Sequence, residues 1–396
     1  MTLDHPILTR WPAQYPGRLG VARPSSCASG RAARAGGDGG LKKGKPALSE
    51  QLVHQACGTF NQNATAIRCC CVLTSRVPMP QVDWLSHLLK MITITGQLEV
   101  RCAYGAPWRI AWGQSAANEI PYHVVLKGRA VIEDPETGTT KELVGGDIAL
   151  LPHGSAHVLH DGSGHPPGLT RNRRGSAGWT LSENDGQGEH LDMLCGRFFI
   201  GPPHDRLIRS YLPANLVVRA TDSSGEEGAG SASNHLASLM GLMRMESASD
   251  RLGGNAMLNA LTSALFTLVL RAASESEVAP AGLLALAGHS RLAPAISAMF
   301  ADPARPWTLP DLADLCSMSR ATFMRHFQDK LGRSAADLLT DIRMSLAANE
   351  LKKLTMSTEA VAEVVGYQSV SAFRRVFSEW MGMTPGQWRH LAREGQ

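Results

Sequence analysis

The pattern of hydrophobic and polar positions changes twice along the chain. From Asp83 the run WLSHLLKM places apolar residues at helical spacing. From about residue 97 to 160 the apolar residues come in short alternating runs separated by Gly and Pro, which predicts the strands of a β-barrel or jelly roll. Residues 235–245 and 256–270 return to i, i+3, i+4 spacing. The pattern therefore predicts an α+β chain in which helices follow a sheet-rich region.

The domain boundaries are expected where this pattern breaks. The polar, Gly-rich residues 161–189 read as a long mobile loop within the sheet-rich region. The apolar faces of the following helices need a partner, which is either the sheet or the same helices in a second subunit. The predicted parts are a disordered extension over 1–78, a sheet-rich domain over 79–220, a helical dimerisation or packing region over 221–273, a linker over 274–290 and an all-α domain over 291–396.

Charge and cysteine content set the N-terminal extension apart from the rest. The net charge is +4, but residues 1–78 hold ten Lys and Arg against three Asp and Glu, which leaves −3 for the remainder. Five of the eight cysteines lie in this extension, so the remaining three do not form a secreted disulfide framework. The chain lacks the continuous apolar start of a signal peptide. We expect a cytoplasmic protein with no membrane association and a dispensable extension.

The last hundred residues contain one unit twice. The string SRATFMRHFQDKLGRS at 319–334 aligns, at an offset of fifty, with SVSAFRRVFSEWMGMT at 369–384. In each unit two Phe residues lie at i, i+4 and define a buried face, and Ser319 and Ser369 are placed as N-caps. The spacing predicts two helix-turn-helix units, whose second helices enter the DNA major groove. A helix without Gly or Pro joins the two units.

The positions opposite the Phe residues face outward and are the candidates for DNA contact. Arginine alone among them can make bidentate contacts to guanine, so Arg325, Arg374 and Arg375 are expected to read bases. Arg320 and the two capping serines are better placed for phosphate. The full set is Ser319, Arg320, Ala321, Met324, Arg325, Ser369, Ser371, Arg374 and Arg375.

These two strings closely resemble the AraC/XylS family of bacterial transcription regulators. The resemblance covers residues 291–391 and implies two recognition helices in adjacent major grooves. It also implies a double-stranded DNA operator and RNA polymerase as partners, with a homodimer possible. A nucleoid-structuring protein without sequence preference is the competing interpretation for this domain.

The sheet-rich region resembles a cupin. GDIALLPHGSAHVLHD at 146–161 has the spacing of the second cupin motif, with Gly146, Pro152, Gly154 and His157. The first motif is incomplete, because His123 has no second His two residues on and Glu133 comes too late. The resemblance implies a small double-stranded β-helix that acts as a sensor, without cofactor or catalysis. His123 and His157 remain weak metal candidates, with His153 or His160 as further ligands, and a metal-dependent cupin enzyme is the less favoured alternative.

Two cysteines fall in this sensor region. The positions of Cys102 and Cys195 resemble the two cysteines of the reactive-chlorine-responsive regulators of the same family. The resemblance implies that Cys102 attacks the oxidant and that Cys195 resolves the product as a disulfide, with Arg101 and Arg109 as candidates to activate Cys102. Two alternatives stay open. Both thiols can be buried core residues, or the barrel can bind a small-molecule inducer lined by Trp108, Trp112 and Tyr122.

Overall fold

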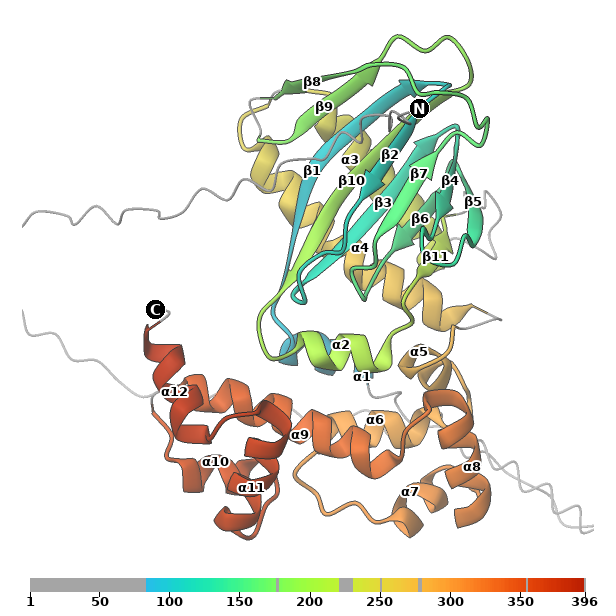
Figure 1. The fold of residues 1–396 in the computed structure, drawn as a ribbon. Helices are drawn as coiled ribbons and strands as arrows, with labels where there is room; N and C mark the ends of the chain where they lie inside the picture. The colour runs from blue at the N-terminus through green and yellow to red at the C-terminus, as the bar shows by residue number, and fades with distance from the viewer. Residues whose placement is uncertain are drawn as a thin grey trace, which may run out of the picture. The chain divides into compact units, whose positions relative to one another are not determined.

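A computed structural model describes residues 83–175, 178–220, 231–249, 251–276, 280–353 and 355–394. These residues form a sheet-rich region followed by helices and then an all-helical region (Figure 1). The α+β prediction is confirmed. The predictions for residues 1–78, including the disordered extension and its cysteines, lie outside the described residues.

The sheet-rich region contains two sheets (Figure 1). The larger has the strand order β11-β6-β3-β10-β1-β9-β8, and the smaller has the order β2-β7-β4-β5. The longest strands pair as antiparallel neighbours, β1 with β10 and β10 with β3. The strands are β1 (Ile94–Gly105), β2 (Arg109–Trp112), β3 (Glu119–Lys127), β4 (Arg129–Glu133), β5 (Thr140–Val144), β6 (Asp147–Leu150), β7 (His157–His160), β8 (Thr170–Arg174), β9 (Thr180–Asn184), β10 (His190–Ile200) and β11 (Leu216–Arg219).

Two apolar cores lie on the two faces of the larger sheet. Because side chains alternate along a strand, β1 and β10 each supply residues to both cores. The core between the sheets includes Cys102, Met193 and Cys195 together with Leu159 of β7. The opposite face carries residues such as Tyr122 and Phe198, which pack against helices.

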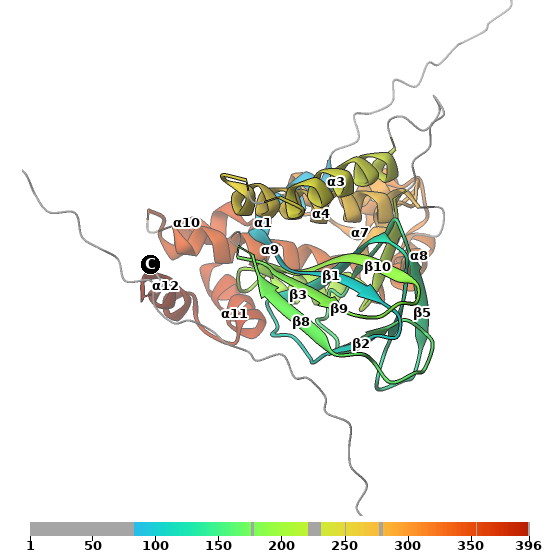
Figure 2. The same ribbon diagram turned by 90° about the horizontal axis from the view of Figure 1, so that it is seen from above.

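The helices that cover this second face are α3 (Ala232–Ser247) and α4 (Gly254–Glu275), which run side by side along the sheet (Figure 2). The Gly96 N–H donates to Ser263 Oγ at 3.2 Å, and Tyr122 Oη lies 3.3 Å from Thr262 Oγ1. A Cβ at Gly96 would come within 2.4 Å of the Thr262 side chain, so only glycine permits this approach. Among the described residues α4 alone has the length and hydropathy to cross a membrane, and here it packs on its own sheet.

Two ranges differ from the sequence-based prediction. Where 161–189 was expected to be a mobile loop, β8 and β9 extend the larger sheet through paired backbone hydrogen bonds. All five residues of β8 are exposed because it is an edge strand, so it carries no alternating pattern. Part of the expected linker 274–290 is the helix α5 (Leu283–Ala287), in which all three leucines are buried.

The all-helical region follows the predicted repeat. In each unit a seven-residue helix precedes a twelve-residue helix that ends at a left-handed glycine, Gly332 with φ 73° and Gly382 with φ 78°. Ser319 and Ser369 accept from the backbone N–H three residues on, as predicted for N-caps. The remaining helices are α1 (Trp84–Met91), α2 (Asp205–Tyr211), α6 (Ala293–Ala301), α7 (Leu309–Leu315), α8 (Arg320–Leu331), α9 (Ala335–Lys352), α10 (Thr358–Val364), α11 (Val370–Met381) and α12 (Pro385–Glu394).

Candidate nucleic-acid interface and buried thiol site

The first recognition helix, α8, presents its predicted contact residues to solvent. Phe323 and Phe327 are buried, with ring centroids 5.3 Å apart. Ser319, Arg320, Ala321, Met324 and Arg325 are all exposed, Met324 by 55%. This face combines two cations with small and apolar side chains, which suits phosphate and base-edge contact.

The second recognition helix, α11, repeats the arrangement. Phe373 and Phe377 are buried with centroids 5.7 Å apart, and the predicted Ser369, Ser371, Arg374 and Arg375 are exposed. Arg374 differs from the other arginines because its Nη2 donates to Glu359 Oε1 of α10 at 2.8 Å.

Three arginines on these faces are unpaired. Within the described part of the chain, Arg320, Arg325 and Arg375 make no ion pair or side-chain hydrogen bond. A guanidinium without a partner keeps all five donors available for a ligand. Sequence reasoning did not separate Arg374 from Arg375, because the Glu359 contact spans fifteen positions.

The helix between the units, α9, fixes their separation. It has 18 residues, or about 27 Å at roughly 1.5 Å per residue. The buried carboxylate of Asp341 accepts from Arg333 Nη1 at 2.8 Å and from Trp380 Nε1 at 2.8 Å. Arg333 follows α8 and Trp380 lies in α11, so one carboxylate joins both units.

The two sensor-region cysteines lie on neighbouring strands. In the β1–β10 register Cys102 is opposite Met193 and Cys195 is opposite Val100, so the cysteines are diagonal neighbours on one face. Both are free and buried, with 0% and 3% exposure. Burial, followed by a hydrogen bond with Cys102, raises the pKa of the Cys195 thiol well above its usual value. A register shift between Leu98 and Val100 interrupts β1 beside Cys195.

Two buried histidines adjoin Cys195. His123 Nδ1 lies 3.1 Å from Cys195 Sγ, and His123 Nε2 lies 2.7 Å from His157 Nε2. Burial lowers the pKa of both imidazoles, and the neighbouring His157 lowers that of His123 further. The Trp112 ring stacks on His157 with centroids 5.4 Å apart. Cys102, Cys195, His123 and His157 therefore form one cluster, which we call the thiol–imidazole cluster.

This cluster does not fit the metal set of a cupin enzyme. A catalytic metal needs about three protein ligands that converge on one point, and Cys195 and His157 lie at opposite nitrogens of His123. Glu133 pairs with Arg109 and His160, and His153 Nε2 lies 3.1 Å from the carbonyl of Leu212. Within the described residues, no group of three His, Cys, Asp or Glu side chains is arranged to hold a metal.

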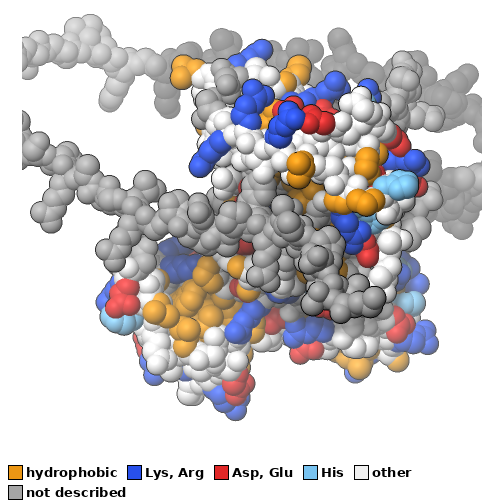
Figure 3. All heavy atoms as spheres, turned by 45° about the horizontal axis from the view of Figure 1, so that its top comes forward, with side chains coloured by type: hydrophobic (Ala, Val, Ile, Leu, Met, Phe, Trp, Pro, Cys, Tyr) orange, Lys and Arg blue, Asp and Glu red, His pale blue; other side chains and the backbone are white. Residues whose placement is uncertain are grey.

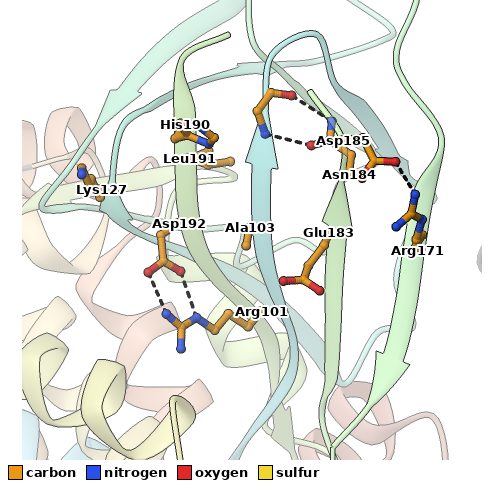
Figure 4. Close-up of a pocket in the computed structure, with 11 residues that line it drawn as sticks. Arg101, Ala103, Lys127, Arg171, Glu183, Asn184, Asp185, His190, Leu191 and Asp192 are labelled. Atoms are coloured by element: carbon orange, nitrogen blue, oxygen red, sulfur yellow. Dashed lines mark hydrogen bonds and ion pairs between the residues drawn. The ribbon is translucent and has the colours of Figure 1, made fainter. Parts of the chain in front are cut away.

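The arginines expected to activate Cys102 have other partners. Arg101 makes two hydrogen bonds to Asp192, at 3.0 and 2.8 Å, in a surface groove on the outer side of β1 (Figure 4). Arg109 pairs with Glu133 at 3.2 Å. These contacts do not support the prediction that Arg101 and Arg109 activate the Cys102 thiol. On the surface of the sheet-rich region, Lys and Arg side chains are mixed with Asp and Glu, as Figure 3 shows.

The three aromatic residues expected to line an inducer cavity lie in two different cores, Tyr122 in one and Trp108 and Trp112 in the other. Tyr122 packs against Phe198 in the core that contacts α4, whereas Trp112 contacts His157 between the sheets. A cavity of about 380 Å³ instead opens beside His157, lined by apolar groups such as Ile132, Leu151 and Val217.

The order of the parts defines the class of protein. Residues 83–275 match a cupin family model and residues 312–390 match a helix-turn-helix domain model. The chain is a transcription regulator of the AraC type, with a cupin sensor domain followed by a DNA-binding helix-turn-helix domain.

Similar proteins include two that are named as transcriptional regulators. An uncharacterized HTH-type transcriptional regulator of Haemophilus influenzae is 27% identical over 78% of this chain and 98% of its own length. RclR of Escherichia coli, an RCS-specific HTH-type transcriptional activator, is 29% identical over 79% of this chain and 99% of its own. The solved structure of ToxT from Vibrio cholerae O395 is 14% identical, covers 76% of this chain and 98% of that one, and has a TM-score of 0.30.

Proposed function

We propose that this cytoplasmic regulator senses an oxidant through Cys102 and Cys195 and performs no catalysis on a substrate. The observation that carries the proposal is the placement of two buried thiols as diagonal neighbours on adjacent strands, in one core. The RCS-specific activity in the name of its Escherichia coli relative supports the same class of signal.

A disulfide between these cysteines requires a local change in the sheet. Diagonal neighbours across an antiparallel pair have Cα atoms about 7–8 Å apart, whereas a disulfide needs roughly 4.4–6.8 Å. The register shift in β1 beside Cys195 is a place where the strand can adjust. Closure therefore pulls β1 toward β10, and α4 packs directly on β1 at Gly96. Through this contact, a movement of β1 can be transmitted to helix α4.

The thiol proposal predicts the behaviour of cysteine variants. Oxidant should change DNA affinity or transcription with the parent chain, because the disulfide alters the sheet. Cys102→Ala should abolish the change, since it removes the attacking thiol, and Cys195→Ala should weaken it. The measurement is DNA binding by fluorescence anisotropy with and without hypochlorous acid. An unchanged response in the double Cys→Ala variant would refute the thiol switch and favour the small-molecule alternative.

For DNA recognition we propose that Arg325, Arg374 and Arg375 read bases and that Arg320 contacts phosphate. Replacing Arg375 by alanine should cost about 1–3 kcal/mol at one operator position and relax specificity there. Met324→Ala should change specificity in the other half of the operator, which we expect α8 to contact. Binding to sequences selected from a random pool by the purified protein measures both effects, with exposed Arg393 of α12 as the control position. Equal losses on selected and unrelated DNA would show that Arg375 contacts only phosphate.

Further partners are proposed from exposed apolar residues. Leu242, Met245, Leu252 and Met257, on and between α3 and α4, are each about half exposed or more. Soluble surfaces rarely gather large apolar side chains without a partner. We propose a second copy of this chain here, and RNA polymerase as the partner of the DNA-bound protein. A small-molecule inducer is the second candidate signal, favoured by the cavity beside His157.

A further inference from the structure

The resolving thiol, Cys195, needs a group to accept its proton. A thiol attacks another sulfur as the thiolate, but burial keeps Cys195 protonated by raising its pKa. The side chain is 3% exposed, so water does not reach it freely. His123 Nδ1 lies 3.1 Å from Cys195 Sγ, within hydrogen-bonding distance of the thiol.

The hydrogen bonds around His123 fix which nitrogen is free. His157 Nδ1 lies 2.8 Å from the carbonyl of Ser155, and a carbonyl only accepts, so this nitrogen carries the hydrogen. A neutral His157 then has a bare Nε2, which accepts from His123 Nε2–H across 2.7 Å. Neutral His123 therefore has a bare Nδ1, and that lone pair faces the Cys195 S–H. The Ser155 carbonyl therefore determines the tautomer of His123 through His157, although it does not contact His123 itself.

Other titratable groups near the two thiols are less suited to the task. Tyr104 lies in the same core as Cys102, but its hydroxyl donates to Ser182 at 2.6 Å, and burial raises its pKa. Glu99 lies at the β1 irregularity and is 3.4 Å from Arg197. Within the described residues, His123 alone presents a neutral basic atom to a thiol of the pair.

We infer that His123 is the general base of disulfide closure, with His157 as the residue that positions it. This inference rests on the thiol switch proposed above. Hypochlorous acid transfers chlorine to Cys102, giving a sulfenyl chloride and water. Cys195 then attacks the Cys102 sulfur, its proton passes to His123 Nδ1, and chloride leaves as the S–S bond forms. Two thiols and one hypochlorous acid become a disulfide, water, chloride and one proton, which His123 takes from Cys195 and then releases to solvent.

The test separates the first oxidation from closure. Full-length protein is mixed with one equivalent of hypochlorous acid and quenched over time with dimedone, which traps the sulfenic acid formed when water hydrolyses the sulfenyl chloride. Peptide mass spectrometry then follows the Cys102 adduct and the Cys102–Cys195 disulfide. In His123→Gln, the amide still donates to His157 but cannot take a proton. Cys102 should be oxidised at the parent rate, and closure should slow on the order of 100-fold.

Two further variants control for structural effects. His157→Gln keeps an acceptor for His123 and should slow closure less than His123→Gln does. His160→Gln changes a histidine that lies on β7 with His157 but contacts neither thiol. This variant should form the disulfide at the parent rate. If the parent forms the disulfide, and His123→Gln and His123→Asn both form it as fast as the parent does, His123 is not the base. The thiol switch would still stand. If the parent forms no Cys102–Cys195 disulfide, the switch and this inference both fail.

Discussion

Replacing Phe373 by alanine should lower the free energy of unfolding of the DNA-binding domain by about 3–5 kcal/mol. The side chain is 0% exposed and lies between two other rings, Tyr367 at 5.8 Å and Phe377 at 5.7 Å between centroids. Truncation leaves a cavity that the short helix α10 and the linking helix α9 cannot fill without moving. The loss should be visible in urea titrations followed by circular dichroism.

Val364 provides the matched control for this substitution. It lies on α10 of the same helix-turn-helix unit but is 51% exposed, so Val364→Ala should change stability by less than about 0.5 kcal/mol. A loss below 1 kcal/mol for Phe373→Ala would mean that the paired Phe positions do not form the core of the unit.

Lowering the pH from 7 to 5 should destabilise the sensor domain, by about 2 kcal/mol from His204 alone, with further losses from buried His123 and His157. Burial lowers the pKa of His204 to about 4 and that of His123 well below its usual value. An unfolded histidine titrates near 6.5. Between pH 6.5 and the pKa of each folded histidine, the unfolded chain binds more protons than the folded chain does. The stability that depends on neutral histidines is therefore present above pH 6.5 and is lost as the pH falls below it.

The His123→Gln variant isolates one part of this effect. The urea unfolding midpoint of this variant should depend less steeply on pH than that of the parent. The difference between the two slopes is the contribution of His123. Identical slopes in the parent and in His123→Gln would mean that His123 is protonated in the folded protein.

The helix-turn-helix units could be predicted because their signals are local. The Phe pairs at i, i+4 and the capping serines lie within one helix of each other, and the structure has each in its expected place. The edge strand β8 could not be predicted, because both of its faces are exposed and the sequence TRNRR has no apolar alternation. Polar composition there reflects a sheet edge.

The thiol–imidazole cluster depends on contacts that no local pattern contains. His123 and Cys195 are 72 positions apart, and their contact follows from the register of β3 against β10. The sequence identified all four residues as candidates, but for two separate sites, a redox pair and a weak metal pair. The tautomer of His123 depends on a backbone carbonyl at Ser155, which side-chain identity does not reveal.

The tandem arrangement of the two units gives the operator a direction. The units follow one another along one chain and share Asp341, but their reading faces differ, with Met324 and Arg325 in one and Arg374 and Arg375 in the other. If these proposed faces read bases, each monomer needs two unlike boxes of fixed spacing. Inverting such a site turns the bound protein end for end on the promoter, so inversion changes which surface faces the transcription start even when affinity is unchanged.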